Sequence, residues 1–378
     1  METTKKIRVG IVCYPTYGGS GVVATELGIS LAKKGHEIHF ISYRQPFRLD
    51  NYSTNIFFHE VTIPDYPLFD YAPYELNLTS KLVDVVMHEN LDLLHVHYAI
   101  PHASAAVSAK NILSTYGINI PIITTLHGTD ITLLGKDESF KPVIEYSINQ
   151  SDAITAVSKD LILSTKKYFN IDQDINLIPN FIDVSLYKNK SNFELRKKFA
   201  NKGEKLLVHV SNFRKVKRVN DVIRIFNDVN KRIPCKLLMI GDGPDRIDAE
   251  KLTRELNLTQ NIRFVGKIKS VEKFLSISDI FLLTSESESF GLVALEALAS
   301  SVPVISTNQG GINEVNINGA TGYLFNVGDI KNMSKKCIEI LSDSELLKEL
   351  RDNSLIHAKN FDIKNIVPMY ENLYDNLT

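Results

Sequence analysis

The segment 285–299, Ser-Glu-Ser-Glu-Ser-Phe-Gly-Leu-Val-Ala-Leu-Glu-Ala-Leu-Ala, carries the residue types best suited to chemistry. Glu288 precedes an expected helix that starts near Phe290–Gly291, and Glu296 lies about two turns inside it. Eight residues at about 100° each bring the two carboxylates to within about 80° of one another around the helix axis. Such a pair can hold sugar and ribose hydroxyls while the helix N–H groups hold a diphosphate. Glycoside hydrolysis is an alternative use of two carboxylates. A purely structural alternative has Glu288 favouring the helix dipole and Glu296 pairing on the surface.

A cluster of cations follows an expected strand at residues 205–210. The sequence Ser211-Asn-Phe-Arg-Lys-Val-Lys-Arg218 places four cations, Arg214, Lys215, Lys217 and Arg218, within five residues. Such a run is usually a solvated face, but directly after a strand it stands where a phosphate would bind. We expect at least one of the four to contact phosphate. Gly241, in the turn Ile240-Gly-Asp-Gly-Pro244, either lines the same site or only makes the corner.

A glycine-rich turn follows the first expected strand. Gly19, Gly21 and Ala24 match the dinucleotide fingerprint, and the start of the following helix offers N–H groups to an anion. The second strand ends in Ser-Tyr-Arg44 instead of the acidic residue that binds a ribose. Arg44 would suit a 2′-phosphate, so an NADP-dependent oxidoreductase stays an alternative, as does a turn needed only for tight packing.

Histidines close two strands of the first half. His95 and His97 share one strand face, as metal ligands sometimes do, but no third ligand is suggested nearby, and buried structural histidines are the commoner case. Tyr98, just past the strand end, is the better candidate for a ligand site. In Thr124-Thr-Leu-His-Gly-Thr-Asp130, His127 is expected to face substrate while Asp130 caps a helix.

These motifs need a scaffold of alternating strands and helices, and the chain has that pattern. Strands are expected at residues 7–13, 37–42, 56–61, 93–96, 120–125 and 153–157, and again at 205–210, 236–240, 262–265, 280–284, 304–306 and 322–325. Helices are expected at 21–34, 76–89, 103–116, 220–231, 245–256, 271–276, 293–300, 331–342 and about 363–377. Two series of strands predict two doubly wound α/β domains, residues 1–177 and 178–361, with a final helix at about 362–378 packing back on the first.

Composition limits the function classes. The 378 residues suggest two domains, and 43 Lys plus Arg against 44 Asp plus Glu argue against a basic nucleic-acid-binding field or a polybasic membrane anchor. No apolar run is long enough to span a membrane, and the first residues lack a signal-peptide core. Three scattered cysteines exclude a disulfide framework and fit a reducing cytoplasm.

Taken together, these motifs resemble the retaining glycosyltransferases of family 4, for which the Glu288-x7-Glu296 spacing is characteristic. The likeness runs nearly end to end, through CYPTYGGSGVVATELG, HEIHF, PFRL, LDLLHVHYAIPHA, TTLHGTDIT, SNFRKVKRV, GDGP and SESESFGLVALEALA. The resemblance implies the GT-B fold, in which two Rossmann-like domains face one another. The stretches GGSG, HVHYAIPHA and HGTDIT resemble the branch that transfers N-acetylglucosamine from UDP-GlcNAc to L-malate, the first step of bacillithiol synthesis.

The resemblance also implies roles for single residues. Glu296 would bind the ribose of UDP, Glu288 the donor sugar, and Lys217 the diphosphate, with His127 approaching the hexose. The catalytic residues would be His127, Lys217 and Glu288. The other donor-binding residues would be Gly19, Asn212, Arg214, Gly241, Phe290, Gly291, Leu292 and Glu296, and the acceptor-binding residues Ser20, Arg44, Arg48, Tyr98 and Thr129.

One position departs from the family pattern. Many members carry an arginine five residues before the lysine, where this chain has Asn212, and Arg214 is expected to supply the missing charge. The resemblance implies small-molecule substrates only, with no metal, cofactor, nucleic acid or membrane, and leaves the oligomeric state open, a homo-oligomer included. Alternatives are a related hexosyltransferase with another acceptor, a 2-epimerase of the same fold, and a nucleotide-sugar sensor without catalysis.

Overall fold

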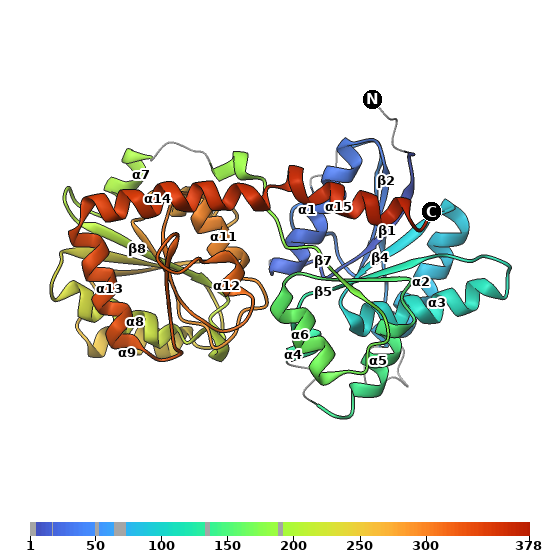
Figure 1. Cartoon of the computed structure of the whole chain (residues 1–378), viewed down its shortest axis with the longest axis horizontal. Coiled ribbons are helices and arrows are strands. Elements are labelled where there is room, and N and C mark those ends of the chain that lie inside the picture. Colours follow the sequence, from blue (N-terminus) through green and yellow to red (C-terminus); the bar gives the residue numbers. More distant parts are fainter. Residues whose placement is uncertain (1–4, 17, 50–52, 64–72, 133–136, 188–191) are drawn as a thin grey trace. The chain divides into compact units, whose positions relative to one another are not determined.

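The computed structural model describes residues 5–16, 18–49, 53–63, 73–132, 137–187 and 192–378. Contacts divide the chain into two compact units. The first comprises Met1–Phe181 and Ile363–Thr378, and the second comprises Ile182–Asp362. In each unit of Figure 1 a sheet lies among helices. Residues 188–191, between the two series of strands, lie outside the described part of the chain.

The sheet of the first unit has seven parallel strands in the described residues, in the order β3-β2-β1-β4-β5-β6-β7. The order reverses between β1 and β4, so the loops that follow these two strands diverge to opposite faces of the sheet, which is where α/β folds bind ligands. The strands are β1 (Arg8–Val12), β2 (Glu37–Ser42), β3 (Ile56–Glu60), β4 (Leu93–His97), β5 (Ile122–Leu126), β6 (Ala153–Ala156) and β7 (Ile175–Leu177).

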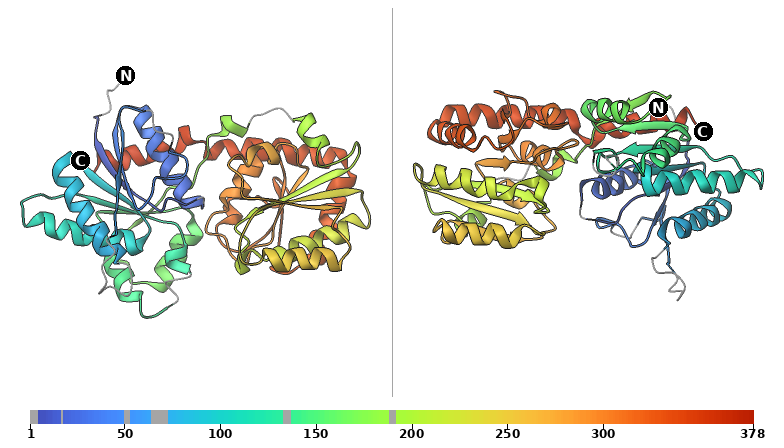
Figure 2. Two further views of the ribbon diagram at one scale, coloured as in Figure 1. Left: turned by 180° about the vertical axis from the view of Figure 1, so that it is seen from behind. Right: turned by 90° about the horizontal axis from the view of Figure 1, so that it is seen from below.

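Helices cover both faces of this sheet (Figure 2). They are α1 (Gly19–Lys33), α2 (Tyr74–Glu89), α3 (Ser104–Ser114), α4 (Thr129–Thr132), α5 (Lys141–Asn149), α6 (Lys159–Tyr168) and α15 (Ile363–Asp375). The C-terminal helix α15 packs against α1 and buries Tyr370 and Tyr374 in the first unit.

The second unit repeats the plan with six parallel strands in its described residues, in the order β10-β9-β8-β11-β12-β13. Here the order reverses between β8 and β11. The strands are β8 (Lys205–Ser211), β9 (Cys235–Gly241), β10 (Ile262–Gly266), β11 (Ile280–Leu283), β12 (Val304–Thr307) and β13 (Gly322–Phe325). The helices are α7 (Phe193–Lys197), α8 (Val219–Asn230), α9 (Arg246–Glu255), α10 (Glu272–Leu275), α11 (Leu292–Ala299), α12 (Ile312–Val315), α13 (Ile330–Ser342) and α14 (Ser344–Ala358).

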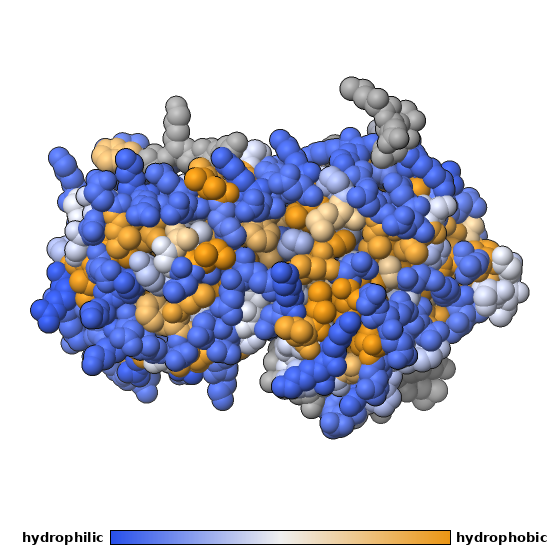
Figure 3. All heavy atoms as spheres, viewed as in Figure 1, coloured by the Kyte–Doolittle hydropathy of each residue, from blue (hydrophilic) through white to orange (hydrophobic). Residues whose placement is uncertain are grey.

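The central strands are buried on both faces because helices cover both. Every residue of β4, β5 and β11 is buried, as expected for parallel strands. Hydrophilic side chains dominate the outer surface in view, with apolar patches on both units (Figure 3). The sequence-based prediction of two doubly wound α/β domains is therefore confirmed.

Candidate functional site

A lysine and a glutamate form the centre of the site in the second unit, at the edge where β8 and β11 end. Nζ of Lys217 lies 2.6 Å from Oε1 of Glu288, and the two side chains are only 19% and 11% exposed. The hydroxyl of Ser285 donates to the same carboxylate oxygen at 2.6 Å. The pair therefore presents one cation and one carboxylate at the position where the strand order reverses.

Glu288 is held by the backbone of a neighbouring loop and not by a helix. It forms a parallel bridge with Gly310, and its carbonyl accepts from the N–H of Gly311 at 2.8 Å. Gly310 has φ 86°, and a Cβ there would lie 2.2 Å from the Glu288 carbonyl oxygen, so this close approach requires glycine. Glu288 precedes α11, as the sequence predicts, but the expected separation of about 80° between the two carboxylates around the helix axis is wrong, because α11 begins only at Leu292 and Glu288 has no helical position.

Glu296 lies inside α11 and is buried, with 6% of its surface exposed. The Tyr187 hydroxyl donates to Oε1 of Glu296 at 2.9 Å. This burial contradicts the alternative in which Glu296 pairs on the surface. Ahead of α11, Gly291 has φ 93°, and Phe290 is buried with its ring 5.6 Å from that of Phe361.

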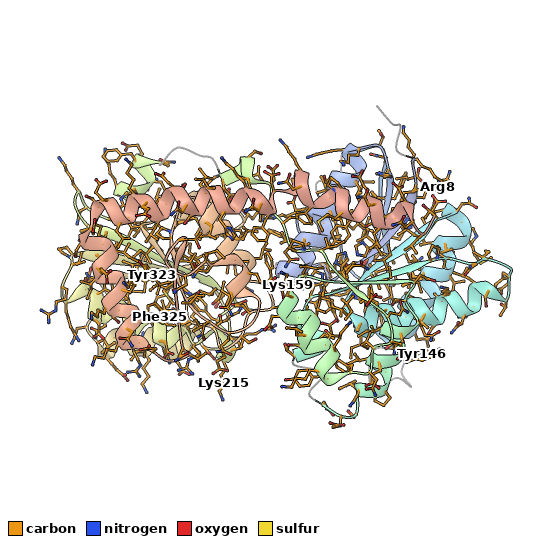
Figure 4. All side chains as sticks on the ribbon, in the orientation of Figure 1. Arg8, Tyr146, Lys159, Lys215, Tyr323 and Phe325 are labelled. Carbon is orange, nitrogen blue, oxygen red and sulfur yellow. The ribbon has the colours of Figure 1, made fainter. Side chains whose placement is uncertain are left out.

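The four cations after β8 have different surroundings. Lys217 meets Glu288, as described, whereas the Arg218 guanidinium contacts Asp221 at 2.7 Å and Glu286 at 3.3 Å. The other two cations, Arg214 and Lys215, are exposed. Asn212, the position that departs from the family pattern, is exposed as well. Lys215 points away from the rim of the second unit (Figure 4).

A buried histidine on β8, near Lys217, adds no positive charge to the site. Burial lowers the pKa of His209 to about 4, so its imidazole is neutral at physiological pH. The Nδ1–H of His209 donates to the Leu282 carbonyl at 2.9 Å, and the Ser211 hydroxyl donates to Nε2 at 2.8 Å. This histidine therefore ties β8 to β11 through uncharged hydrogen bonds.

The glycine-rich turn after β9 packs directly on the loop after β8. A Cβ on Gly241, where φ is 116°, would lie 1.8 Å from the Ser211 carbonyl oxygen. A Cβ on Gly243 would lie 1.9 Å from the carbonyl oxygen of Asn212. Gly241 and Gly243 are therefore needed for the tight turn between β9 and the following helix. The turn also fixes the position of the backbone at Asn212 and Arg214.

In the first unit the reversal point joins a tyrosine to the glycine-rich turn. The Tyr98 hydroxyl, just past β4, donates to Oγ of Ser20 at 2.8 Å. Ser20 lies in the first turn of α1, which begins at the exposed Gly19. A Cβ on Gly21 would lie 2.5 Å from the Tyr14 carbonyl oxygen, so the helix starts close against the preceding loop. Two residues predicted to bind substrate, Ser20 and Tyr98, thus lie together.

His127 belongs to a group of buried imidazoles. Its Nε2 lies 2.8 Å from Nδ1 of His97, and the His97 ring stacks on that of His95 with centroids 4.5 Å apart. Burial lowers the pKa of both His127 and His95 to about 3, so both imidazoles are neutral. In the described part of the chain, no group of three or more metal-binding side chains forms around these histidines.

Asp130 stabilises the loop that carries His127. Its carboxylate is fully buried and accepts from the backbone N–H of Ala99 at 2.8 Å and of Gly128 at 3.1 Å. Burial raises the pKa of Asp130 to about 6. Asp130 therefore joins the loops after β4 and β5, while Thr129 beside it is exposed at the start of α4.

The two arginines considered for the acceptor differ. Arg44 is exposed just past β2. Arg48 is partly buried, and its Nη1 lies 3.1 Å from Oε1 of Glu26 on α1. To bind a substrate carboxylate, Arg48 would have to share or leave that ion pair.

Sequence reasoning missed two residues that shape these clusters, Tyr187 and Ser285. It singled out His97 but did not pair it with His127. Tyr187 lies 109 residues before Glu296, and no local pattern connects the two. Ser285, in contrast, belongs to the segment that contains Glu288. Its position three residues before Glu288 could have indicated the hydrogen bond between them.

Comparison with known proteins defines the class. Residues 17–186 match the family described as Glycosyltransferase Family 4, and residues 191–355 match Glycosyl transferases group 1. Over 371 residues the chain is 47% identical to N-acetyl-alpha-D-glucosaminyl L-malate synthase of Bacillus anthracis, covering 98% of this chain and 97% of that protein. An uncharacterized glycosyltransferase of Methanocaldococcus jannaschii is 28% identical over 99% of both chains.

Solved structures share the fold. The Anabaena protein HepE in complex with UDP and glucose superposes with a TM-score of 0.83 at 17% identity, over 98% of this chain and 100% of that one. Sucrose-phosphate synthase of Thermosynechococcus elongatus gives 0.82 at 20% identity, over 98% and 99%. The chain therefore has the GT-B fold of glycosyltransferases.

More narrowly, the chain belongs to the family 4 glycosyltransferases. This membership overturns the alternative of an NADP-dependent oxidoreductase. Within the described residues, no helix is both long and apolar enough to cross a membrane.

Proposed function

We propose that this glycosyltransferase moves N-acetylglucosamine from UDP-GlcNAc to the hydroxyl of L-malate, with retention at the anomeric carbon, as the first step of bacillithiol synthesis. The observation that carries the proposal is the 47% identity with the L-malate synthase of Bacillus anthracis across nearly the whole of both chains. Solved proteins of this fold in complex with UDP and UDP-glucose support a UDP-sugar donor.

The donor half of the proposal rests on the charges in the second unit. Lys217 and the N-terminal end of α11 would stabilise the negative charge that builds on the β-phosphate as UDP leaves. Because Lys217 lies 2.6 Å from Glu288, binding of the diphosphate would divide this cation between two anions and free Glu288 to accept from sugar hydroxyls. Protein cations would do this work, so the reaction needs no metal ion. The buried Glu296 would accept from the ribose hydroxyls.

The acceptor half rests on the first unit. Malate has two carboxylates and one hydroxyl, and the pair formed by Ser20 and Tyr98 offers hydroxyl donors beside the N-terminal end of α1. Exposed Arg44 is the cation best able to meet a carboxylate, since Arg48 already contacts Glu26. The neutral His127 would act as a hydrogen-bond partner of the hexose and not as a cation.

Retention by attack from the face that UDP departs from needs a base on that same face of the sugar. The leaving phosphate oxygen would take the proton of the malate hydroxyl, while Glu288 binds and positions the donor. The bond from the anomeric carbon to the phosphate oxygen breaks as the bond to the malate oxygen forms, so UDP leaves carrying the acceptor's proton.

The test is release of UDP from UDP-GlcNAc across a panel of acceptors: L-malate, D-malate, other hydroxy acids and simple sugars. We expect strong stimulation by L-malate, weak stimulation by D-malate, and an α-linked product by NMR. Stimulation only by other acceptors would keep the glycosyltransferase and remove L-malate. UDP-GlcNAc binding without turnover with any acceptor would indicate a sensor, and product formation without an acceptor would indicate an epimerase.

A further inference from the structure

A histidine lies buried inside the sheet of the first unit, away from the residues assigned to the reaction. His39, on β2, has 0% of its surface exposed. Its Nε2 lies 3.1 Å from Oε1 of Glu37, and its Nδ1 lies 2.9 Å from Nε2 of His59. A carboxylate accepts hydrogen bonds, so Nε2 of His39 carries the proton and Nδ1 directs its lone pair toward His59.

Strand register and the end of a helix bring a third ligand to this place. In the parallel pairing of β2 with β3, Ile41 lies opposite His59, so His39 and His59 are diagonal neighbours on one face of the sheet. Glu89 is the last residue of α2. One ligand atom from each of the three side chains lies within 4.8 Å of the others, and among the described residues this is the only such group of three or more.

We propose that His39, His59 and Glu89 bind one Zn²⁺ ion. Two imidazoles and one carboxylate are a common zinc ligand set, and the half-exposed His59 and Glu89 leave water access to a fourth position. Two nitrogens about 2.0–2.1 Å from a tetrahedral ion are about 3.3 Å apart. The observed 2.9 Å between the imidazole nitrogens therefore needs an opening of only a few tenths of an ångström.

Glu37 completes the arrangement on the far side of His39. A ligating histidine usually donates its other N–H to a carboxylate, which fixes its tautomer and orientation. Glu37 does this and is itself paired with Arg8, whose Nε lies 3.3 Å away and which Figure 4 labels. When the ion binds, the proton between the two imidazoles moves to Nδ1 of His59, so both imidazoles ligate in their neutral form.

The ion would act on the fold of the first unit. β3 is the edge strand of the sheet and pairs only with β2 in the described residues. A zinc ion on His39, His59 and Glu89 ties this edge to β2 and to the end of α2. Zinc therefore stabilises the first unit by an amount that rises with the logarithm of the free Zn²⁺ concentration once this exceeds the dissociation constant, independently of glycosyl transfer.

The test is metal titration of the full-length protein after removal of metals with a chelator. We expect one equivalent of Zn²⁺ by calorimetry, an increase in Tm on addition of Zn²⁺, and visible absorption typical of a tetrahedral site when Co²⁺ replaces it. X-ray absorption of the zinc-loaded wild type should give a shell of nitrogen and oxygen ligands that includes two imidazoles.

Matched variants localise the ion. His59→Gln and Glu89→Gln should each weaken Zn²⁺ binding by at least tenfold, and Glu37→Gln by a smaller factor. His88→Gln is the control, because His88 is exposed one position before Glu89 and lies outside the proposed ligand set. Circular dichroism checks folding, and if His59→Gln fails to fold, Glu89→Gln decides.

The proposal is overturned if the stripped wild type takes up no stoichiometric Zn²⁺. It is equally overturned if Zn²⁺ binding is unchanged in Glu89→Gln, or if His88→Gln weakens it as much as the ligand variants do. In these cases His39 and His59 form only a hydrogen-bonded pair that packs the sheet edge.

Discussion

The two units have the same strand order around the point where that order reverses, but the side chains at this point are charged in one unit and neutral in the other. In the second unit the loops after β8 and β11 bring together charges, Lys217 with Glu288. In the first unit the corresponding loops after β1 and β4 bring together neutral groups, Ser20 with Tyr98, beside the neutral His127. The second unit thus presents charged side chains at the place where the diphosphate would leave. The first unit presents hydrogen-bonding groups at the place where the acceptor would bind.

The largest expected difference between the two units is in how much stability each loses when the pH is lowered. In the first unit burial lowers the pKa of His95 and His127 to about 3, of His102 to about 4, and of His97 well below its usual value. The unfolded chain takes up these protons as pH falls through about 6.5, whereas the folded unit does not, so stability is lost on acidification. Each such proton costs about 1.4 kcal/mol per pH unit.

Asp130 and His209 determine how large this difference in pH-dependent stability is. Asp130, with its pKa raised to about 6, binds its proton first in the folded state and offsets about one histidine as pH falls below 6. In the described part of the second unit, His209 is the one fully buried histidine. Hydrogen exchange at pH 7 and pH 5, corrected for intrinsic rates, should show β4 and β5 losing more protection than β8 and β11. Equal losses would contradict the contrast.

Lys217→Met should lower kcat/KM for UDP release by about 10²–10³-fold, because it removes the cation expected to stabilise the leaving diphosphate. Lys215→Met is the matched control: Lys215 is exposed two residues earlier, and its loss should change kcat/KM by less than twofold. The melting temperature should stay close to wild type in Lys215→Met and fall in Lys217→Met, because the mostly buried Glu288 loses its cation partner. Wild-type kinetics in Lys217→Met would remove this lysine from the mechanism.

Glu296→Gln should weaken UDP binding by about tenfold, close to 1.4 kcal/mol, because a neutral amide accepts more weakly from ribose hydroxyls than a carboxylate. Calorimetry measures this directly. The matched variant Glu286→Gln removes a partly exposed carboxylate that contacts Arg218 and should leave UDP affinity unchanged. If the two variants bind UDP alike, Glu296 has no role at the ribose.

Tyr98→Phe should raise the KM for L-malate by about three- to tenfold and leave UDP affinity unchanged, because it removes one hydroxyl from the pair with Ser20. Tyr116→Phe, at a side chain that is 65% exposed, is the control. If Tyr98→Phe changes the affinity for UDP, Tyr98 does not act on the acceptor alone, and its assignment to the acceptor site is contradicted.

Sequence patterns predicted every strand of the described residues except β7, because buried parallel strands leave a strong local pattern. The run Ile280–Leu283 is apolar throughout since it is covered on both faces, and the cations after β8 were visible as a cluster. Helix starts were less exact: α1 begins at Gly19 and α2 at Tyr74, each two residues before the expected start. The sequence pattern did not predict β7, α5, α6 or α14.

The site was only partly predictable because its contacts join distant segments. Glu288 was found from its spacing to Glu296, but its true support, Gly310, lies 22 residues later on another loop. The His39 and His59 pair depends on strand register, and Glu89 reaches it from the end of a helix, so no local motif connects the three. Tertiary pairings of this kind appear only once the fold is known.

A crystal structure with UDP tests the central claim most directly. The account predicts the pyrophosphate against the second unit, with an oxygen within hydrogen-bond distance of Nζ of Lys217 and another at the backbone N–H groups that begin α11. The ribose hydroxyls should donate to Glu296. UDP bound to the first unit alone, or to the second unit away from Lys217 and Glu296, would contradict the account.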